Sequence, residues 1–501
     1  MSLETCLAKL RYVKYGDEVL SSDHNTKVEC LRLLRDRIVE LAERLGVRGL
    51  VSEKLGRLDA ILGMLKYRVA LDIIDPEDHN LLVDGLKAAR DALAELEAIA
   101  VAPPPPPPPA PPPAPPRAGL WYRMSTVRVE SPTGYGVFDE ESRLSFTLPE
   151  DSYVLVIYNA SNRHGSPEAR LGKMVFIVID GEYQLEYLCG QSTYTDNIPN
   201  SVTCTWAGRL QAGAHNVVAE VSGVMGARPV GVDVRQMIVL AAPVSSGPLV
   251  YGVSATQTLC PSFGHWIADP HSRLFFNLND DANVLVIYDV GKEYYPQTPT
   301  SLPTALIYID GRSIPESEYF QHIYDLRDAF GVTCTAFSRL GVGIHSISGM
   351  IVDACISKST IAYVVAPKPW ASAGRMSSSV ITGSLDTMGS PPPWDDPDSI
   401  VTVDLAEDSL CLAVYNAEIF SQVVEGGFTM INIDGVDMEE SFAAQSGGAS
   451  SHNQILSLWA GRLTAGTHTI KGRWGTNNPT GSANLWNRMI AVICIPESLL
   501  I

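Results

Sequence analysis

The sequence predicts a mainly β protein with a helical N-terminal segment, a polyproline linker and three tandem β-sandwich domains. Three observations carry this prediction: a run of prolines, an abrupt change of composition across it, and an internal triplication beyond it. Charged residues make up about a third of residues 1–100 and about 15% of the remainder. A chain of 501 residues is long enough for several independent cores, at roughly 100–200 residues per domain.

The overall charge and hydropathy exclude several classes of protein. The formal net charge is -19 at pH 7, whereas nucleic-acid recognition needs clustered Lys and Arg side chains. No uninterrupted apolar run approaches the ~20 residues of a membrane-spanning helix, and the first residues lack the charged-then-apolar order of a signal peptide. We therefore expect neither a nucleic-acid-binding protein, nor a membrane span, nor an ordinary secretory precursor.

Residues 1–100 are expected to form amphipathic helices that anchor or oligomerise the chain. Apolar residues recur three and four positions apart in three stretches, one of which is Leu31, Leu34, Ile38, Leu41 and Leu45. Each stretch is only about two heptads long, which is shorter than a secure coiled coil. A small helical bundle and a short oligomeric stalk both remain open.

The same segment contains a duplicated Asp-His-Asn triplet, at residues 23–25 and 78–80. Each triplet precedes a helical pattern, where short polar side chains cap free backbone N–H groups; metal binding by His24 and His79 is the alternative. Tyr15-Gly16-Asp17, followed by this triplet, resembles the N-terminal segments of viral and phage tail-fibre or baseplate-associated proteins. The resemblance implies that residues 1–100 bind other virion proteins.

Residues 101–117 are expected to form a proline-rich linker, because twelve prolines lie between positions 103 and 116. Such a run adopts an extended polyproline II helix, which rises about 3.1 Å per residue and holds its flanks about 40 Å apart. The run is either a stiff spacer or a ligand for a proline-binding domain. The change of composition on either side favours the spacer.

The rest of the chain repeats one pattern three times, over residues 118–245, 246–370 and 371–501. The strand-like runs VLVIYNAS, VLVIYDVG and LCLAVYNAE correspond, and so do FIVIDGEY, LIYIDGRS and MINIDGVD. The Asp-Gly pairs of the second set lie 130 and 124 residues apart, a period that indicates whole domains. Short runs rich in Val, Ile and Tyr are broken by turn residues about every ten positions, as in a β-sandwich or barrel.

An aspartate precedes a glycine between two strand-like runs in each repeat; these residues are Asp180, Asp310 and Asp434. The pattern predicts a tight hairpin turn, because glycine tolerates the positive φ that such turns need. Calcium binding is the alternative, but one aspartate per loop supplies few of the six to eight oxygens that calcium prefers.

A histidine also recurs in each repeat, on the apolar face of a later strand; these residues are His215, His345 and His468. The position predicts a buried histidine with a hydrogen-bond partner. A proton switch or a metal ligand is the alternative function for the three histidines.

The whole repeat, with its Ile-Asp-Gly hairpin, its Gly-Arg-Leu-x-Ala-Gly-x-His segment and its closing strand, resembles jelly-roll heads of the tumour-necrosis-factor and complement type. Arg209, Gly213 and His215 match this pattern in the first repeat, as do Arg462 and the residues after it in the third. The second repeat has Ser338 where the others have Gly208 and Gly461, and it has no arginine at the start of its last strand. The resemblance implies jelly-roll-like domains and a trimeric assembly, as at the ends of many phage and archaeal-virus fibres.

No enzyme signature is present, so we expect no catalytic residue, no cofactor and no bound metal. The acidic clusters at 395–398 and 439–440 could form a glycosidase pair, but their flanking Pro and Ser residues favour solvated loops. The nine cysteines lack a CxxC pair and are expected to be small buried hydrophobes. Candidate contacts with a partner are loop aromatics that we expect to be exposed, namely Tyr294, Tyr295 and Trp394.

These patterns favour a non-enzymatic fibre or spike protein on the virion surface that attaches to a host-surface glycan or protein. Linked weak sites would raise the effective concentration of one another. A purely structural protein of an extracellular surface or filament is the alternative, and a surface glycan-degrading enzyme is the third. We expect a homotrimer. The three repeats either form a pseudo-trimer within one chain or stack as tiers of the homotrimer, and both arrangements stay open.

Overall fold

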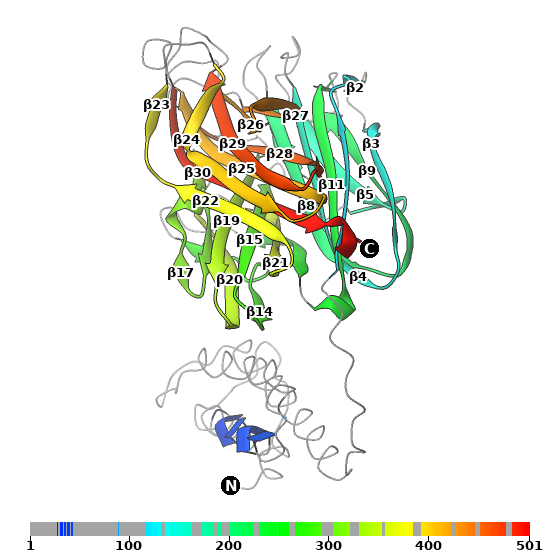
Figure 1. Ribbon diagram of the computed structural model, residues 1–501, viewed down its shortest axis with the longest axis vertical. Coiled ribbons are helices and arrows are strands. Elements are labelled where there is room, and N and C mark those ends of the chain that lie inside the picture. The colour runs from blue at the N-terminus through cyan, green and yellow to red at the C-terminus, as the bar shows by residue number, and fades with distance from the viewer. Residues whose placement is uncertain are drawn as a thin grey trace. The chain divides into compact units, whose positions relative to one another are not determined.

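The computed structural model of the chain divides into two compact units, Met1–Ala114 and Pro115–Ile501 (Figure 1). It describes residues 117–501, except 132–135, 163–172, 185–188, 192–199, 224–229, 248, 260–265, 293–303, 321–329, 353–355, 384–391, 422–426, 446–450 and 477–482. In the first unit it describes 28, 31–33, 35–36, 38–40, 42–43 and 89, all helical, with Val28, Leu31, Ile38 and Ala42 buried. The other helical predictions, the two Asp-His-Asn triplets and the proline run lie outside the described residues. Among the described residues, no helix has the length and hydropathy to cross a membrane.

The regular elements in the described part of the second unit are strands and three short 3-10 helices. The first repeat contains β1 (Gly119–Ser125), β2 (Val129–Ser131), β3 (Val137–Leu148), β4 (Ser152–Asn162), β5 (Lys173–Ile179), β6 (Glu182–Tyr183), β7 (Cys189–Gln191), β8 (Asn200–Leu210), β9 (Gly213–Gly223), β10 (Val230–Val232) and β11 (Val234–Pro243). The second contains β12 (Val250–Leu259), β13 (Ile267–Ala268), β14 (Leu274–Leu278), β15 (Ala282–Lys292), β16 (Thr304–Ile309), β17 (Arg312–Ser313), β18 (Tyr319–Phe320), β19 (Phe330–Leu340), β20 (Gly343–Val352) and β21 (Ile356–Ala366). The third contains β22 (Ala371–Ser377), β23 (Ile381–Gly383), β24 (Trp394–Leu405), β25 (Ser409–Ser421), β26 (Gly427–Ile433), β27 (Val436–Gln445), β28 (Ser451–Leu463), β29 (Gly466–Thr476) and β30 (Ala483–Pro496). The 3-10 turns are η2 (Val244–Ser246), η3 (Pro315–Ser317) and η4 (Glu497–Leu499).

Each repeat contributes two antiparallel sheets with matching strand order. One sheet, here called the inner sheet, has the order β1-β11-β4-β8, β12-β21-β15-β19 or β22-β30-β25-β28. The other, the outer sheet, is built around β3-β9-β5-β6, β14-β20-β16-β17 or β24-β29-β26-β27. The matching order means that a residue of one repeat has a register-equivalent residue in each of the others.

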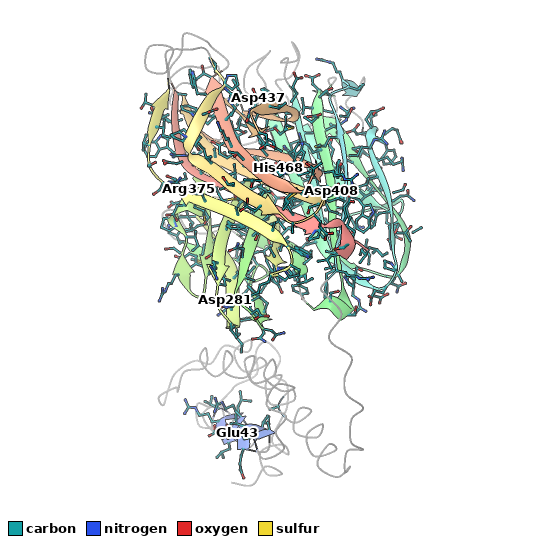
Figure 2. The ribbon with its side chains drawn as sticks, viewed as in Figure 1. Glu43, Asp281, Arg375, Asp408, Asp437 and His468 are labelled. Atoms are coloured by element: carbon teal, nitrogen blue, oxygen red, sulfur yellow. A yellow bond between two sulfur atoms is a disulfide. The ribbon has the colours of Figure 1, made fainter. Side chains whose placement is uncertain are left out.

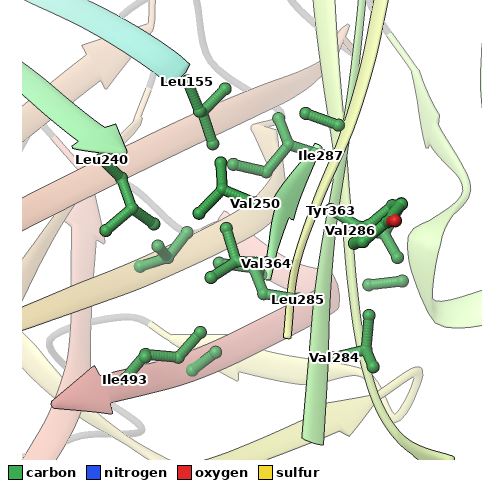
Figure 3. Packing of buried hydrophobic residues seen from close by; sticks show 14 of the residues in the cluster. Leu155, Leu240, Val250, Val284, Leu285, Val286, Ile287, Tyr363, Val364 and Ile493 are labelled. Atoms are coloured by element: carbon green, nitrogen blue, oxygen red, sulfur yellow. The ribbon is translucent and has the colours of Figure 1, made fainter. Parts of the chain in front are cut away.

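The inner sheets are apolar on both faces, and this packs the three repeats together. In β4, Val154 and Val156 join the core of their own repeat, whereas Leu155 and Ile157 join a cluster that also contains Leu285 of the second repeat. The same cluster takes residues of the third repeat such as Ile493 (Figure 3). Residues 115–501 form one compact unit, and one cluster of its core draws residues from all three repeats. The bounds of three separate domains stay a prediction. Because these strands carry apolar side chains on both faces, both faces of each inner sheet are buried against protein.

Polar contacts join the same three inner sheets in a ring. The equivalent residues Asn159, Asp289 and Asn416 follow the buried tyrosine of their strands. Asn159 bonds β28 of the third repeat, Asn416 bonds β19 of the second, and Asp289 bonds β8 of the first. The ends of the unit also meet, since Ala118 forms a parallel bridge with Leu500. The inner sheets of the three repeats thus pack around one shared core within a single chain. The homotrimer stays a prediction.

Candidate binding surface

The repeated aspartate and the repeated histidine form one unit in each outer sheet. Asp434 has a φ of 51° and Gly435 a φ of 87°, the left-handed conformation that a two-residue hairpin turn requires. Asp434 Oδ1 accepts the backbone N–H of Thr469, and Oδ2 lies 2.6 Å from Nδ1 of His468, the residue labelled in Figure 2. The other ring nitrogen of His468 lies 2.8 Å from the carbonyl oxygen of Thr464. The histidine therefore ties the hairpin predicted from the Asp-Gly pair to β29, the strand that pairs with β26.

The other repeats have the same arrangement, with Asp180 and His215 in the first and Asp310 and His345 in the second. The three imidazole side chains are only 10%, 11% and 12% exposed. Both ring nitrogens face acceptors, a carboxylate and a carbonyl, so a ring that carries both protons satisfies both contacts. The sequence indicated the burial but not that the partner is the hairpin aspartate. Among the described residues, no group of three or more His, Cys, Asp or Glu side chains comes together as a metal site.

The pKa values of the histidine and aspartate side chains in this unit reflect their mutual attraction. Burial acts to lower the pKa of His215, but its hydrogen bonds to Asp180 and to the Gln211 carbonyl outweigh burial and raise it. The hydrogen bond to Asp434 raises the pKa of His468 against the effect of burial. Burial would raise the pKa of Asp434, yet the hydrogen bonds from His468 and Thr469 hold it below its usual value. The unit is a structural clamp that is strongest when its two members are oppositely charged.

A second repeated unit is buried between the sheets. Tyr415 donates to Asp396 Oδ2 at 3.1 Å, and the fully buried guanidinium of Arg488 lies 2.9 Å from the same carboxylate. Tyr158, Asp139 and Arg235 repeat this arrangement, whereas the second repeat keeps Tyr288 and Asp269 but has Ser359 in place of the arginine. The expectation of a solvated acidic loop at 395–398 is therefore wrong for Asp396, which is 0% exposed because it pairs with Arg488.

The predicted aromatic contacts have different outcomes. The prediction that Trp394 is exposed is wrong. Trp394 is the first residue of β24, is only 4% exposed and packs edge-to-face on Trp474, with ring centroids 5.2 Å apart. Trp394 and Asp396 lie two positions apart in the strand, so both side chains point to its buried face. Tyr294 and Tyr295 lie outside the described residues.

Sequence reasoning missed an aromatic row on the outer sheet of the first repeat. Phe138 of β3 and Phe176 of β5 both pair in register with Glu220 of β9, so the three side chains stand side by side across the sheet. Tyr183 of β6 adds a third ring, with its centroid 6.3 Å from Phe138 and 6.2 Å from Phe176. Phe138 is 41% exposed and Tyr183 42% exposed. Phe138, Phe176, Tyr183 and Glu220 are called the aromatic row below.

The carboxylate of Glu220 is held in place within the row. The Tyr183 hydroxyl donates to Glu220 Oε2, and this bond, with burial and the negative charge, raises the pKa of Tyr183. Gly136 leaves room for the carboxylate, because a Cβ at this position would collide with it. Two exposed rings and a fixed hydrogen-bond acceptor thus share one face of a rigid sheet.

The equivalent positions of the other repeats carry different chemistry. In the third repeat they are Asp395, Met430, Asp437 and Arg473. Arg473 forms ion pairs of 3.0 Å with Asp395 and 2.6 Å with Asp437, the latter labelled in Figure 2. In the second repeat they are Ala268, Leu306, Ser313 and Met350. The three outer sheets therefore share a backbone but differ in this row. No single-repeat pattern in the sequence indicates the row, because its members come from four separate strands.

A small polar pocket lies where the inner sheets meet. It is lined by register-equivalent residues of β8, β19 and β28, together with neighbours: Ser201, Val202, Thr203, Gly331, Thr333, Gln445, Gln454 and Leu456. It has room for about one water molecule. A pocket of this size does not admit a sugar or a cofactor.

One pair of cysteines departs from the expectation of buried free thiols. Cys411 of β25 and Cys494 of β30 stand directly opposite each other and form a disulfide. Cys334 is a buried free thiol, and Cys204 is likewise buried, as small apolar side chains are.

No protein-family model and no curated protein matches the chain. Among solved structures, it is similar to PNGF-II, with 10% identity and a TM-score of 0.22 over 49% of this chain and 65% of that one, so it spans about two thirds of that chain. It is also similar to a chain of Sulfolobus turreted icosahedral virus, with 9% identity and a TM-score of 0.16 over 75% of this chain and 91% of that one. For infectious bursal disease virus, Gt strain, the identity is 10% and the TM-score 0.17, over 75% of this chain and 72% of that one. These low scores carry no argument about function.

Proposed function

We propose that this chain is a non-enzymatic viral fibre or spike protein that attaches the virion to a host-cell surface. Each repeat is a jelly-roll-like module, and the three modules display their outer sheets around one shared core. The helical segment binds other virion proteins, and the proline run provides reach. The observation that carries the proposal is the aromatic row, because exposed aromatic side chains beside a fixed polar group are typical of binding surfaces.

Rigidity supports the same proposal. The row stands on paired strands whose opposite face packs against the core of the first repeat, through residues such as Ala219 and Val221. A rigid platform binds with little loss of conformational entropy, which matters most for weak ligands. A homotrimer would present three such rows, and linked sites raise the effective concentration to the millimolar range.

A structural surface or filament protein is the second candidate, and one observation favours it. Phe275, Val342 and Ile344 of the second repeat are 49%, 66% and 51% exposed, and Phe275 and Ile344 lie on adjacent strands β14 and β20. Such residues could pack against a neighbouring subunit in a filament.

Immunoelectron microscopy separates the two candidates. Fab fragments raised against the full chain should label the surface of virus particles and reduce particle adsorption to cells. Label that is confined to extended filaments on cells, with adsorption unchanged, would contradict the attachment function and support the structural one.

A further inference from the structure

We propose that the aromatic row of the first repeat binds a neutral pyranose ring of a glycan. This inference rests on the proposed attachment function and names the class of ligand that the function would use. The row supplies the two chemical features that a pyranose requires: an apolar surface for its C–H face and an acceptor for its hydroxyl groups.

The apolar surface comes from Phe138 and Tyr183. Their rings are tilted by 33° with centroids 6.3 Å apart, and about two fifths of each side chain is exposed. Phe176 meets Tyr183 at 87° and supports it from the side. The exposed rings therefore form an open platform, and an aromatic face carries partial negative charge that attracts the C–H groups of a sugar.

The acceptor is the Glu220 carboxylate. Its Oε2 accepts the Tyr183 hydroxyl, while a carboxylate can accept about four hydrogen bonds through its two oxygens. The remaining capacity is available to sugar hydroxyls, and bonds to a charged acceptor are about twice as strong as neutral ones. The Tyr183 hydroxyl is protonated at neutral pH, as in an ordinary tyrosine, and can therefore donate to the carboxylate.

A cation is the competing ligand, because aromatic faces and a carboxylate also attract ammonium groups. The open platform favours the sugar, because the C–H side of a pyranose chair is broad enough to contact two rings whose centroids are 6.3 Å apart, whereas a compact cation contacts one. The other repeats lack this chemistry, since an arginine with two aspartates occupies the equivalent row of the third and aliphatic or small residues occupy that of the second. One sugar site per chain is therefore expected.

Saturation-transfer difference NMR on the full chain tests the assignment, with methyl β-glucopyranoside, methyl β-galactopyranoside and choline as separate probes in excess. We expect transfer to the ring C–H protons of a glycoside, weakened about tenfold in Phe138→Ala and in Tyr183→Ala. Phe275→Ala removes an exposed aromatic side chain outside the row and should leave the transfer unchanged. Circular dichroism of each variant shows that it remains folded.

Three results would overturn the assignment: no transfer to either glycoside, an equal loss in Phe275→Ala, or transfer to choline alone that the row variants abolish. Transfer that depends on the row, without Fab label on particles, would retain the sugar site and defeat the attachment function. Blocked adsorption without glycoside transfer would retain the attachment function and defeat the sugar site.

Discussion

Asp289 accepts the backbone N–H of Thr205 at 3.1 Å and the Thr205 hydroxyl at 3.0 Å, across the boundary between the second and first repeats. At the equivalent position of the third repeat, Asn416 instead donates to the carbonyl of Thr333 at 2.7 Å. The strands that receive these contacts are edge strands of their inner sheets, so their outward backbone groups need partners. An ionised carboxylate can only accept and therefore bonds an N–H, whereas an amide can donate to a carbonyl.

Asn416→Leu should destabilise the β unit by about 2–4 kcal/mol, because it leaves the buried Thr333 carbonyl and the Gln454 amide without their partner. Asn277→Ala alters an exposed asparagine and should cost about 0.5 kcal/mol or less. Urea unfolding of both variants measures the difference. Equal midpoints would show that the ring contributes nothing to cohesion between the repeats.

Stability should depend on pH through the histidine–aspartate clamps. A raised pKa of His468 adds stability that is complete below the pKa of the unfolded histidine and is lost as pH rises through the folded value. A lowered pKa of Asp434 adds stability above the unfolded aspartate value that is lost as pH falls through the folded one. The advantage of the wild type over Asp434→Asn in Tm should therefore be largest between about pH 4 and 6.5.

Asp404→Asn is the matched control for this pH series, because Asp404 bonds the Thr467 hydroxyl and not the histidine. Its difference from the wild type should be flat from pH 5 to pH 8, a window of about three units around the histidine range. A flat difference for Asp434→Asn as well would contradict a charged clamp.

Arg488→Met should destabilise the chain by about 3–5 kcal/mol, because it leaves the Asp396 carboxylate buried without its cation. Arg462→Met removes an exposed arginine that pairs with Asp408 and should cost under about 1 kcal/mol. Chemical unfolding of the two variants decides the matter: a loss for Arg488→Met no larger than that for Arg462→Met would mean that the buried pair is not stabilising in this context.

The Cys411–Cys494 disulfide closes a loop with a sequence separation of 83 residues. Reduction, or the Cys411→Ala variant, should lower the free energy of unfolding by about 2–5 kcal/mol. Cys334→Ala, which alters a free buried cysteine, serves as the control for cavity formation. Intact mass spectrometry after alkylation under denaturing conditions would contradict the disulfide if both cysteines carried the label.

The sequence predicted the parts of the fold that depend on local pattern. The Asp-Gly hairpins follow from the positive φ that glycine tolerates, and the strands follow from alternating or continuous apolar runs. The link from Asp434 to His468 could not be predicted, because it joins residues 34 positions apart whose pairing depends on the register of β26 and β29. Taken alone, the Asp434 position indicates a turn and the His468 position indicates the core.

The candidate surface was harder to predict for a related reason. Trp394 lies among Pro and Asp residues that are typical of loops, yet it begins a strand and faces inward. The aromatic row depends on three strands that align Phe138, Glu220 and Phe176, and on a hairpin that adds Tyr183. Composition ranks aromatic residues by type, whereas exposure depends on which face of a strand they occupy.

Competition between soluble full-length chain and virus particles for cells tests the central claim most directly, namely that the chain attaches through the aromatic row. The wild-type chain should reduce adsorption, Phe275→Ala should do so equally well, and the double variant Phe138→Ala, Tyr183→Ala should need at least about tenfold more protein. A double variant that competes as well as the wild type, or a wild-type chain that leaves adsorption unchanged, would contradict it.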